Sequence, residues 1–178
     1  MKRLVVLAVF AVVPTMLMAD DAADPLAPAR QGMVQCYDPS LAAKTCRAIG
    51  AFSFESDGTI TYESTVALPS DGNVLIMKTK SPVTMRGDAV CGLISRDTIK
   101  AASLTEKGRR LPPDDANQVR VQLQMVMASR FGKESCTTYK AFHDESYAKV
   151  TLDGVADPDT SGYMRWVKPD DGYTVVLP

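Results

Sequence analysis

Residues 59–79, TITYESTVALPSDGNVLIMKT, contain two strand-like segments and the turn that joins them. The first segment, Thr59 to Val66, is rich in β-branched and aromatic residues, and the second runs from Val74 to Thr79. Between them, Ser70-Asp71-Gly72 supplies the residue types that form tight turns. Because so short a connection cannot hold a crossover helix, we expect the two segments to pair antiparallel.

The same alternation of short strands and turns extends over most of the chain. Further strands are predicted at 51–54, 83–85, 139–143, 147–152, 163–167 and 173–177. Turn residues separate them at 56–58, 86–88, 157–159 and 170–172. A short helical turn is expected over 95–102, with Ser95 as its cap. The predicted fold class is α+β, a mostly antiparallel β-sheet with one principal helix covering a face and disulfides stapling the structure.

One long segment interrupts the strand pattern, and we predict the principal helix there, over about 114–131. Asp114 and Asp115 suit the first turn of a helix. Apolar residues at alternate positions from Val119 to Met127 would also fit a strand, and periodicity alone does not decide between the two. The length of the segment and its content of Gln, Arg, Met and Ala favour the helix.

The chain begins with the features of an export signal. Lys2 and Arg3 precede an apolar run from Leu4 to Met18, and Ala19 is a small residue at which a signal peptidase can cut. The run is shorter than the roughly 20 apolar residues that cross a membrane, so cleavage is favoured over an uncleaved anchor. Residues 1–19 are therefore predicted to be a signal peptide, and the protein to be periplasmic or secreted.

The domain organisation after the signal is predicted to be simple. Residues 20–30 consist mainly of Asp, Ala and Pro, so little can be buried there and a flexible leader is expected. Residues 31–178 suffice for a single α+β domain with a core of its own. No stable membrane insertion is expected after signal cleavage.

The charge balance argues against a nucleic-acid partner. The formal net charge is −1 at pH 7, and removal of Lys2 and Arg3 with the signal makes it about −3. Binding to phosphates requires a clustered basic surface. The densest basic run is Lys107-Gly108-Arg109-Arg110, which fits a solvated hairpin tip.

Cys36, Cys46, Cys91 and Cys136 form an even set in a chain predicted to reach an oxidising compartment. Four cysteines allow three pairings. We favour Cys36 with Cys46, because Tyr37-Asp38-Pro39 can turn between them, which leaves Cys91 with Cys136. Redox or zinc chemistry is the alternative, but the close cysteine spacing typical of either is missing.

An internal repeat is a further hypothesis. A gap-free alignment of residues 46–88 with residues 136–178 gives nine identical pairs, and each copy leads from a cysteine through an Ala-Phe segment into a strand. Chance similarity between two ordinary β-meanders is the alternative explanation.

No catalytic, cofactor-binding or metal site is predicted. The only histidine, His143, has carboxylates only as sequence neighbours, and adjacent strand residues point to opposite faces. Common hydrolase and nucleotide-binding motifs are missing. Acidic pairs, which fit turns better than a catalytic cleft, occur at 114–115, 157 with 159, and 170–171. Tyr163 and Trp166 form a candidate contact patch.

The predicted function is accordingly a non-catalytic binding or interaction module of the periplasm, with an unidentified envelope protein or ligand as partner and no cofactor. Two alternatives stay open. One is a hydrolase acting on envelope material through carboxylates brought together by folding, and the other is a structural envelope protein. A cleft with two close carboxylates would favour the hydrolase.

The export signal leads to a first prediction. N-terminal sequencing of the exported protein should begin at Asp20 or within a few residues of it, because Ala19 ends the apolar run. Recovery of intact Met1 in the membrane fraction would contradict cleavage.

Overall fold

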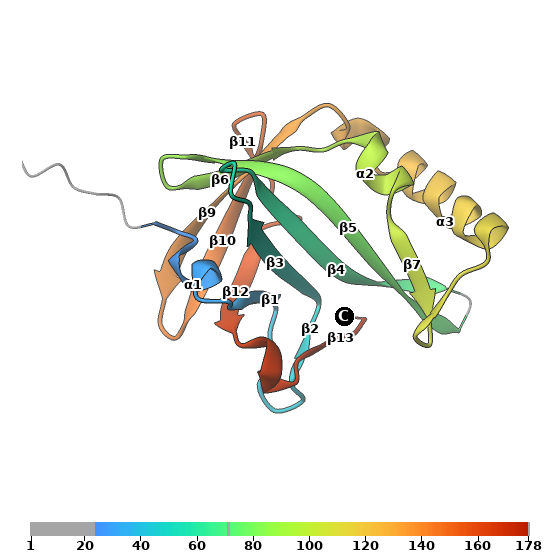
Figure 1. Cartoon of the computed structure of the whole chain (residues 1–178), viewed down its shortest axis with the longest axis horizontal. Helices are drawn as coiled ribbons and strands as arrows, with labels where there is room; N and C mark the ends of the chain where they lie inside the picture. The colour runs from blue at the N-terminus through green and yellow to red at the C-terminus, as the bar shows by residue number, and fades with distance from the viewer. Residues whose placement is uncertain (1–23, 71, 178) are drawn as a thin grey trace, which may run out of the picture.

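The computed structural model describes residues 24–70 and 72–177, and within them eight antiparallel strands close into a barrel (Figure 1). Around the barrel the strands follow their order in the sequence: β1 (Val34–Tyr37), β3 (Ala48–Phe54), β4 (Ile60–Ser70), β5 (Asn73–Arg86), β6 (Ala89–Leu93), β9 (Glu134–Phe142), β10 (Glu145–Leu152) and β12 (Gly162–Val167). The last strand, β12, pairs with the first, β1, and this pairing closes the ring.

Short turns join most neighbouring barrel strands. The predicted hairpin of β4 and β5 is confirmed, with Tyr62 opposite Ser81 in the register. Gly87 begins the turn between β5 and β6 with a φ of 61°, in the left-handed region that favours glycine. His143 has a φ of 51° in the turn between β9 and β10, so it lies at a hairpin tip and not within a strand.

The sheet-rich, disulfide-linked architecture is confirmed, whereas the α+β arrangement needs correction. A helix was expected over one face of a sheet, but the sheet closes on itself. Its inner face is therefore covered by the opposite wall of the barrel, and the helices lie toward the barrel ends (Figure 1). The pairing that closes the barrel joins residues distant in sequence, so local patterns could not reveal it.

The principal helix is confirmed as α3 (Pro113–Val126), which is followed by the 3-10 turn η1 (Ala128–Arg130). The sequence predicts one uninterrupted helix over 114–131, whereas α3 ends at Val126 and the separate 3-10 turn follows it. The least exposed residues of α3 recur with the period of a helix. They are Ala116, Val119, Arg120, Leu123 and Gln124. This spacing excludes the strand alternative.

The shorter predicted helix is confirmed as α2 (Arg96–Lys100). The Ser95 hydroxyl accepts a hydrogen bond from the backbone N–H of Asp97 at 3.1 Å, as a helix cap should. Ile99 is the buried residue of this helix, and it also lines the barrel interior.

Some strands were not predicted or were predicted in pieces. β1 and β6 were missed, and β5 is continuous where two strands, 74–79 and 83–85, were expected. Pro82 lies between the two predicted pieces, where β5 pairs with β4 alone, between its pairings with β7 (Ser103–Glu106) and β6. Proline is tolerated at such a locally unpaired edge.

The remaining described elements are short: β2 (Thr45–Cys46), β8 (Arg109–Arg110), β11 (Val155–Ala156), η2 (Pro169–Asp171) and β13 (Thr174–Val175). β7 and β8 form a hairpin whose turn is Lys107-Gly108, so the basic run occupies a hairpin tip as predicted.

The segment just before the barrel differs from the predicted flexible leader over 20–30. Residues 24–30 form a turn and the short helix α1 (Ala27–Arg30), in which Leu26 is fully buried and Ala29 nearly so. Both pack against interior residues of the barrel, including Val90. Burial of these two apolar side chains stabilises the segment, because the barrel presents an apolar end for them to cover.

The two segments of the suggested repeat do not occupy equivalent positions. Phe52 packs inside the barrel, whereas its counterpart Phe142 lies at the end of β9 and is 48% exposed. Ser53 lies within β3, whereas its counterpart His143 lies in a turn. These two matched pairs of residues therefore lie in different environments.

Both predicted disulfides are present. Cys36 is bonded to Cys46 with their Cα atoms 5.3 Å apart, which joins β1 to β2. Cys91 is bonded to Cys136 at directly opposed positions of β6 and β9, so this bond supports the register of two barrel strands. Such bonds are characteristic of proteins from oxidising compartments.

No helix among the described residues has the length and apolar character needed to span a membrane. The predicted signal peptide, 1–19, lies outside the described residues.

The buried position of Leu26 leads to a second prediction. Leu26→Ala should lower the free energy of unfolding by about 2–5 kcal/mol, because it leaves a void at the end of the barrel. Leu41→Ala, at a residue that is 50% exposed, is the matched control and should change it by no more than about 0.5 kcal/mol. Urea unfolding measures both, and an equal effect of the two substitutions would show that α1 does not seal the barrel.

Candidate functional site

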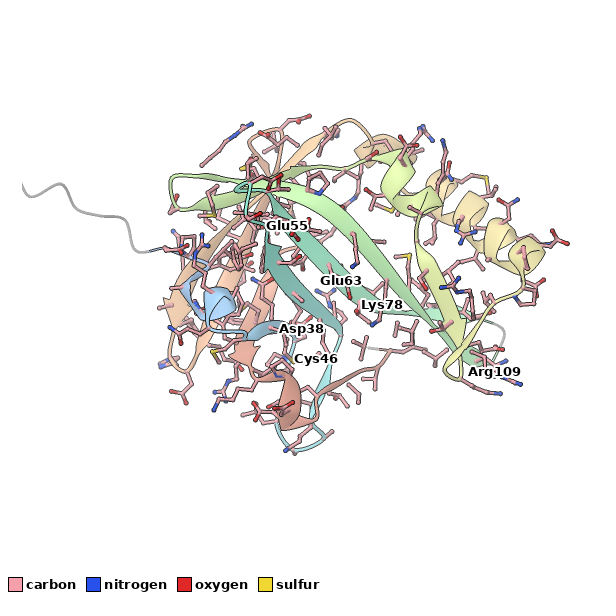
Figure 2. All side chains as sticks on the ribbon, in the orientation of Figure 1. Asp38, Cys46, Glu55, Glu63, Lys78 and Arg109 are labelled. Carbon is pink, nitrogen blue, oxygen red and sulfur yellow. A yellow bond between two sulfur atoms is a disulfide. The ribbon has the colours of Figure 1, made fainter. Side chains whose placement is uncertain are left out.

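Alternate residues of the barrel strands face its interior. On β4, Tyr62 and Ser64 line the inside, whereas Glu63 between them lies on the outer wall (Figure 2). There its carboxylate pairs with the Lys80 ammonium group at 3.0 Å. The period of two therefore places charged groups outside and uncharged groups inside along this strand.

The inward side chains surround a cavity of about 460 Å³, within the range typical of small-molecule sites. Apolar residues of its wall include Phe52, Val66, Met77, Val83, Val90 and Ile99. Hydroxyl groups interrupt this surface at Ser64, Thr79, Ser81, Thr98, Ser135 and Thr137. None of the residues described along the wall carries a charge.

A group of three phenols and one amide, Gln35, Tyr37, Tyr62 and Tyr139, lies within the barrel; we call it the tyrosine cluster. The three tyrosines line the cavity, and Gln35 is fully buried on β1. The Tyr37 hydroxyl donates a hydrogen bond to Gln35 Oε1 at 3.0 Å. The other end of that amide, Nε2, is buried and has no hydrogen-bond partner among the described residues.

The backbone brings this cluster together through one glycine. Gly50 on β3 lies opposite Gln35 on one side and Ser64 on the other. A Cβ atom at Gly50 would collide with the Tyr62 ring and hydroxyl. Because glycine has no side chain, the Tyr62 ring can lie across the wall of the barrel toward β1.

The phenols of the cluster stay protonated. Burial raises the pKa of Tyr37, Tyr62 and Tyr139. The neighbouring phenols raise the pKa of Tyr37 further, whereas for the pKa of Tyr62 the effect of Tyr139 is to raise it and that of Tyr37 to lower it. The neighbouring Gln35 amide and Tyr37 hydroxyl partly oppose the effect of burial on the pKa of Tyr139. All three hydroxyls are consequently neutral hydrogen-bond donors at physiological pH.

The cavity has one sealed end and one end formed by helices. Val83 and Val90 line it and also pack against the buried group around Leu26, so α1 closes this end. Toward the opposite end, Ile99 of α2 and Met127 after α3 line the wall. Access to the cavity is expected on this second side, where loops and helices meet the barrel.

An ion pair links two segments of that second end. Arg130 Nη1 lies 2.7 Å from Asp157 Oδ2, and the Thr160 hydroxyl donates to the same carboxylate oxygen at 2.8 Å. These contacts connect η1 to the loop before β12. Since Met127 and Thr160 both line the cavity, the ion pair ties together two parts of its rim.

The residues of the predicted contact patch are separated by the barrel wall. Trp166 faces the interior, with its ring centroid 6.4 Å from that of Phe52. Tyr163 is 42% exposed on the outside, where its ring contacts those of Phe142 and Tyr147. An odd spacing within β12 places the two on opposite faces, so they do not form one patch.

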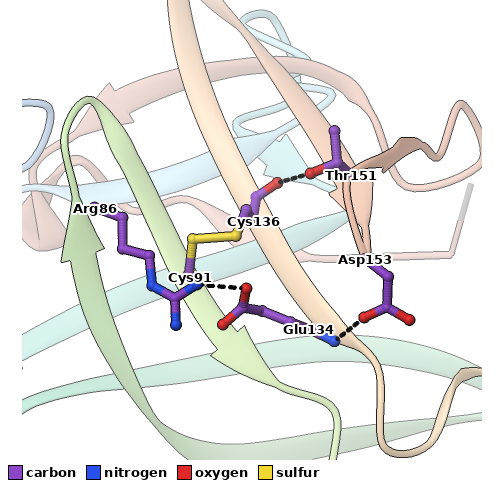
Figure 3. Close-up of a disulfide and its surroundings, with 6 residues drawn as sticks. All are labelled: Arg86, Cys91, Glu134, Cys136, Thr151 and Asp153. Carbon is purple, nitrogen blue, oxygen red and sulfur yellow. Dashed lines mark hydrogen bonds and ion pairs between the residues drawn. A yellow bond between two sulfur atoms is a disulfide. The ribbon is translucent and has the colours of Figure 1, made fainter.

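The second disulfide lies beside a carboxylate but does not form a metal site. Glu134 lies close enough to the sulfurs of Cys91 and Cys136 to share a ligand sphere with them. Both sulfurs are consumed in their mutual bond, so neither is a thiolate ligand (Figure 3). The Glu134 carboxylate instead accepts from Arg86 at 2.7 Å.

Among the described residues that line the cavity, none belongs to the acidic pairs considered for a hydrolase. Asp157 and Asp159 both approach Arg130, at 2.7 and 3.9 Å, and thus take part in the rim contact. Asp114 and Asp115 are exposed at the start of α3. The third pair, 170–171, lies in η2.

Sequence analysis missed the tyrosine cluster. Tyr37 was assigned to a turn between two cysteines, and Gln35 was given no role. The alternation of Met33, Gln35 and Tyr37 with Val34 and Cys36 was the available signal, although four residues of strand are too few to stand out.

Comparison of the chain with protein families, with characterised proteins and with solved structures gives no match. The function proposed below therefore rests on the cavity and the residues that line it.

The rim contact leads to a third prediction. The Thr160 hydroxyl and the Arg130 guanidinium lower the pKa of Asp157 against the opposing effect of its burial. The resulting stabilisation is present above the ordinary carboxyl pKa of about 4 and is lost as the pH falls through the lowered value. Asp157→Asn should thus cost about 1.5–3 kcal/mol at neutral pH, with a smaller difference from the parent in acid.

Urea unfolding at several pH values measures this effect. Asp159→Asn is the matched control, since the Asp159 side chain is 85% exposed and 3.9 Å from Arg130. A pH-independent loss in Asp157→Asn would contradict the assigned role of its charge.

Proposed function

We propose that this protein is an exported, non-catalytic binding module that holds a small, mainly apolar ligand inside its barrel. The observation that carries the proposal is the cavity of about 460 Å³ with an uncharged wall and a hydrogen-bonding cluster. Small-molecule sites typically combine a mainly apolar wall with a few polar groups that orient the ligand. Eight-stranded barrels provide an interior of suitable size for one small ligand.

The wall chemistry favours binding over hydrolysis. Hydrolysis by paired carboxylates requires both groups beside the substrate. Along the described wall of the cavity there is no carboxylate, histidine or free thiol. A ligand in the cavity would therefore meet hydroxyl, amide and apolar groups, which bind and orient more readily than they cleave.

The two disulfides support a periplasmic or secreted location. Both are formed within the domain, and one supports the pairing of β6 with β9. A purely structural envelope protein would need no internal space for a ligand, and cavities in a protein core lower stability. The hydroxyl-lined space is better explained by binding.

Binding of a neutral apolar dye tests the proposal and gives a fourth prediction. Fluorescence of N-phenylnaphthylamine should rise on addition of the purified protein with both disulfides intact. Thr79→Trp should abolish the rise, because Thr79 faces the cavity and an indole would fill much of it. Thr84→Trp introduces the same side chain at an exposed position of β5 and should leave the rise unchanged.

Unfolding curves would establish that both tryptophan variants are folded. Dye binding that is the same in Thr79→Trp and Thr84→Trp would place the dye outside the barrel and contradict the proposal.

A further inference from the structure

We infer that the ligand is a neutral molecule carrying a carbonyl group, held with its carbonyl oxygen against the hydroxyls of Tyr62 and Tyr139. This inference rests on the proposed function, since it names the class of ligand for the same cavity. Two observations support it. The tyrosine cluster contains hydrogen-bond donors that are not paired within the cluster, and the described wall of the cavity carries no charged side chain.

The tyrosine cluster has more hydrogen-bond donors than it uses internally. The Tyr37 proton is directed to Gln35 Oε1 at 3.0 Å. Gln35 Nε2 is buried and has no hydrogen-bond partner in the described part of the chain, although an unsatisfied buried donor costs about 1–3 kcal/mol. The Tyr62 and Tyr139 hydroxyls add two donors that border the cavity.

A carbonyl oxygen complements this surplus of donors. It carries two lone pairs and no proton, so it can accept from two hydroxyls at once. A ligand hydroxyl can accept as well, but its own proton then requires a further acceptor, whereas a carbonyl pairs the two hydroxyls with no such requirement. A hydrocarbon without oxygen would leave the donors unpaired and would exclude the water that could otherwise satisfy them.

The uncharged wall selects against ionised ligands. Moving a carboxylate or an ammonium group from water into an apolar cavity is unfavourable unless an opposite charge meets it there. No residue described along the wall is charged, and burial keeps the phenols protonated. The rim charges Arg130 and Asp157 already neutralise each other at 2.7 Å. A fatty acid in its ionised form is therefore disfavoured relative to a neutral carbonyl compound of the same size.

A matched set of fluorescent ligands tests this inference. The three probes share a dimethylaminonaphthalene body: prodan, which carries a ketone; the corresponding naphthoate, which carries a carboxylate; and the parent compound, which carries neither group. At neutral pH we expect prodan to bind at least about tenfold more tightly than the naphthoate, a difference of about 1.4 kcal/mol. Equal or tighter binding of the naphthoate would overturn the inference.

Removal of single hydroxyls identifies where the carbonyl lies. Tyr62→Phe and Tyr139→Phe preserve the rings, and each should weaken prodan binding about threefold to tenfold, as expected for one lost hydrogen bond. Binding of the parent compound should stay the same or become tighter. Tyr147→Phe is the matched control, because that ring contacts Tyr163 on the outer wall. Equal weakening of prodan and of the parent compound would overturn the assignment of the carbonyl to these hydroxyls.

The outcomes distinguish the inference from the proposed function. If none of the probes binds and Thr79→Trp has no effect on dye fluorescence, the proposed function fails together with the inference. If the parent compound and the naphthoate bind inside the barrel as tightly as prodan, the proposed function stands and the inference fails. If either phenylalanine variant does not fold, the comparison of the three probes on the parent protein still decides the charge preference.

Discussion

Closure of the barrel by pairing of β12 with β1 is the constraint on which the rest of the structure depends. Each of the eight barrel strands thereby has a neighbour on both sides, which satisfies backbone groups that an open sheet would leave at its edges. The same pairing places Gln35 opposite Trp166 and brings β1 to the wall of the cavity. Since β1 also pairs with β3, Gln35 and Tyr37 would stay near Tyr62 without it, but this side of the barrel would no longer connect them to Tyr139 on β9.

The barrel interior is apolar at the end covered by α1 and carries hydroxyl groups further along. The hydroxyl groups lower the free energy of unfolding relative to a fully apolar interior. Around Leu26 and Val90 the interior is packed, and α1 seals it from solvent. Further along, serine and threonine hydroxyls occupy positions where aliphatic side chains would bury more apolar surface. Stabilisation from the sealed end and from two disulfides offsets this loss. An interior that is packed less tightly, and is therefore less stabilising, is typical of binding sites.

The ion pairs differ in their contribution according to where they lie on the barrel. Ion pairs lie on the outer wall and at the rim, as in Glu63 with Lys80 and Arg130 with Asp157. The first pair is largely exposed and contributes little to stability. The second includes an Asp157 side chain only 8% exposed and holds together two cavity-lining segments, so it can influence both the stability and the access of the cavity.

The sequence by itself determined the local features of this protein. Turn residues between short β-branched segments predicted the antiparallel hairpin of β4 and β5, an acidic start predicted α3, and an even set of cysteines predicted both disulfides. Each of these depends on residues close in the chain or on a simple pairing choice. Only the tertiary structure decided that the sheet closes, that Leu26 plugs one end and that Trp166 and Tyr163 lie on opposite sides of the wall. It also decided the cavity, because a shared interior depends on which faces of distant strands meet, and a period of two in each strand does not specify its partners.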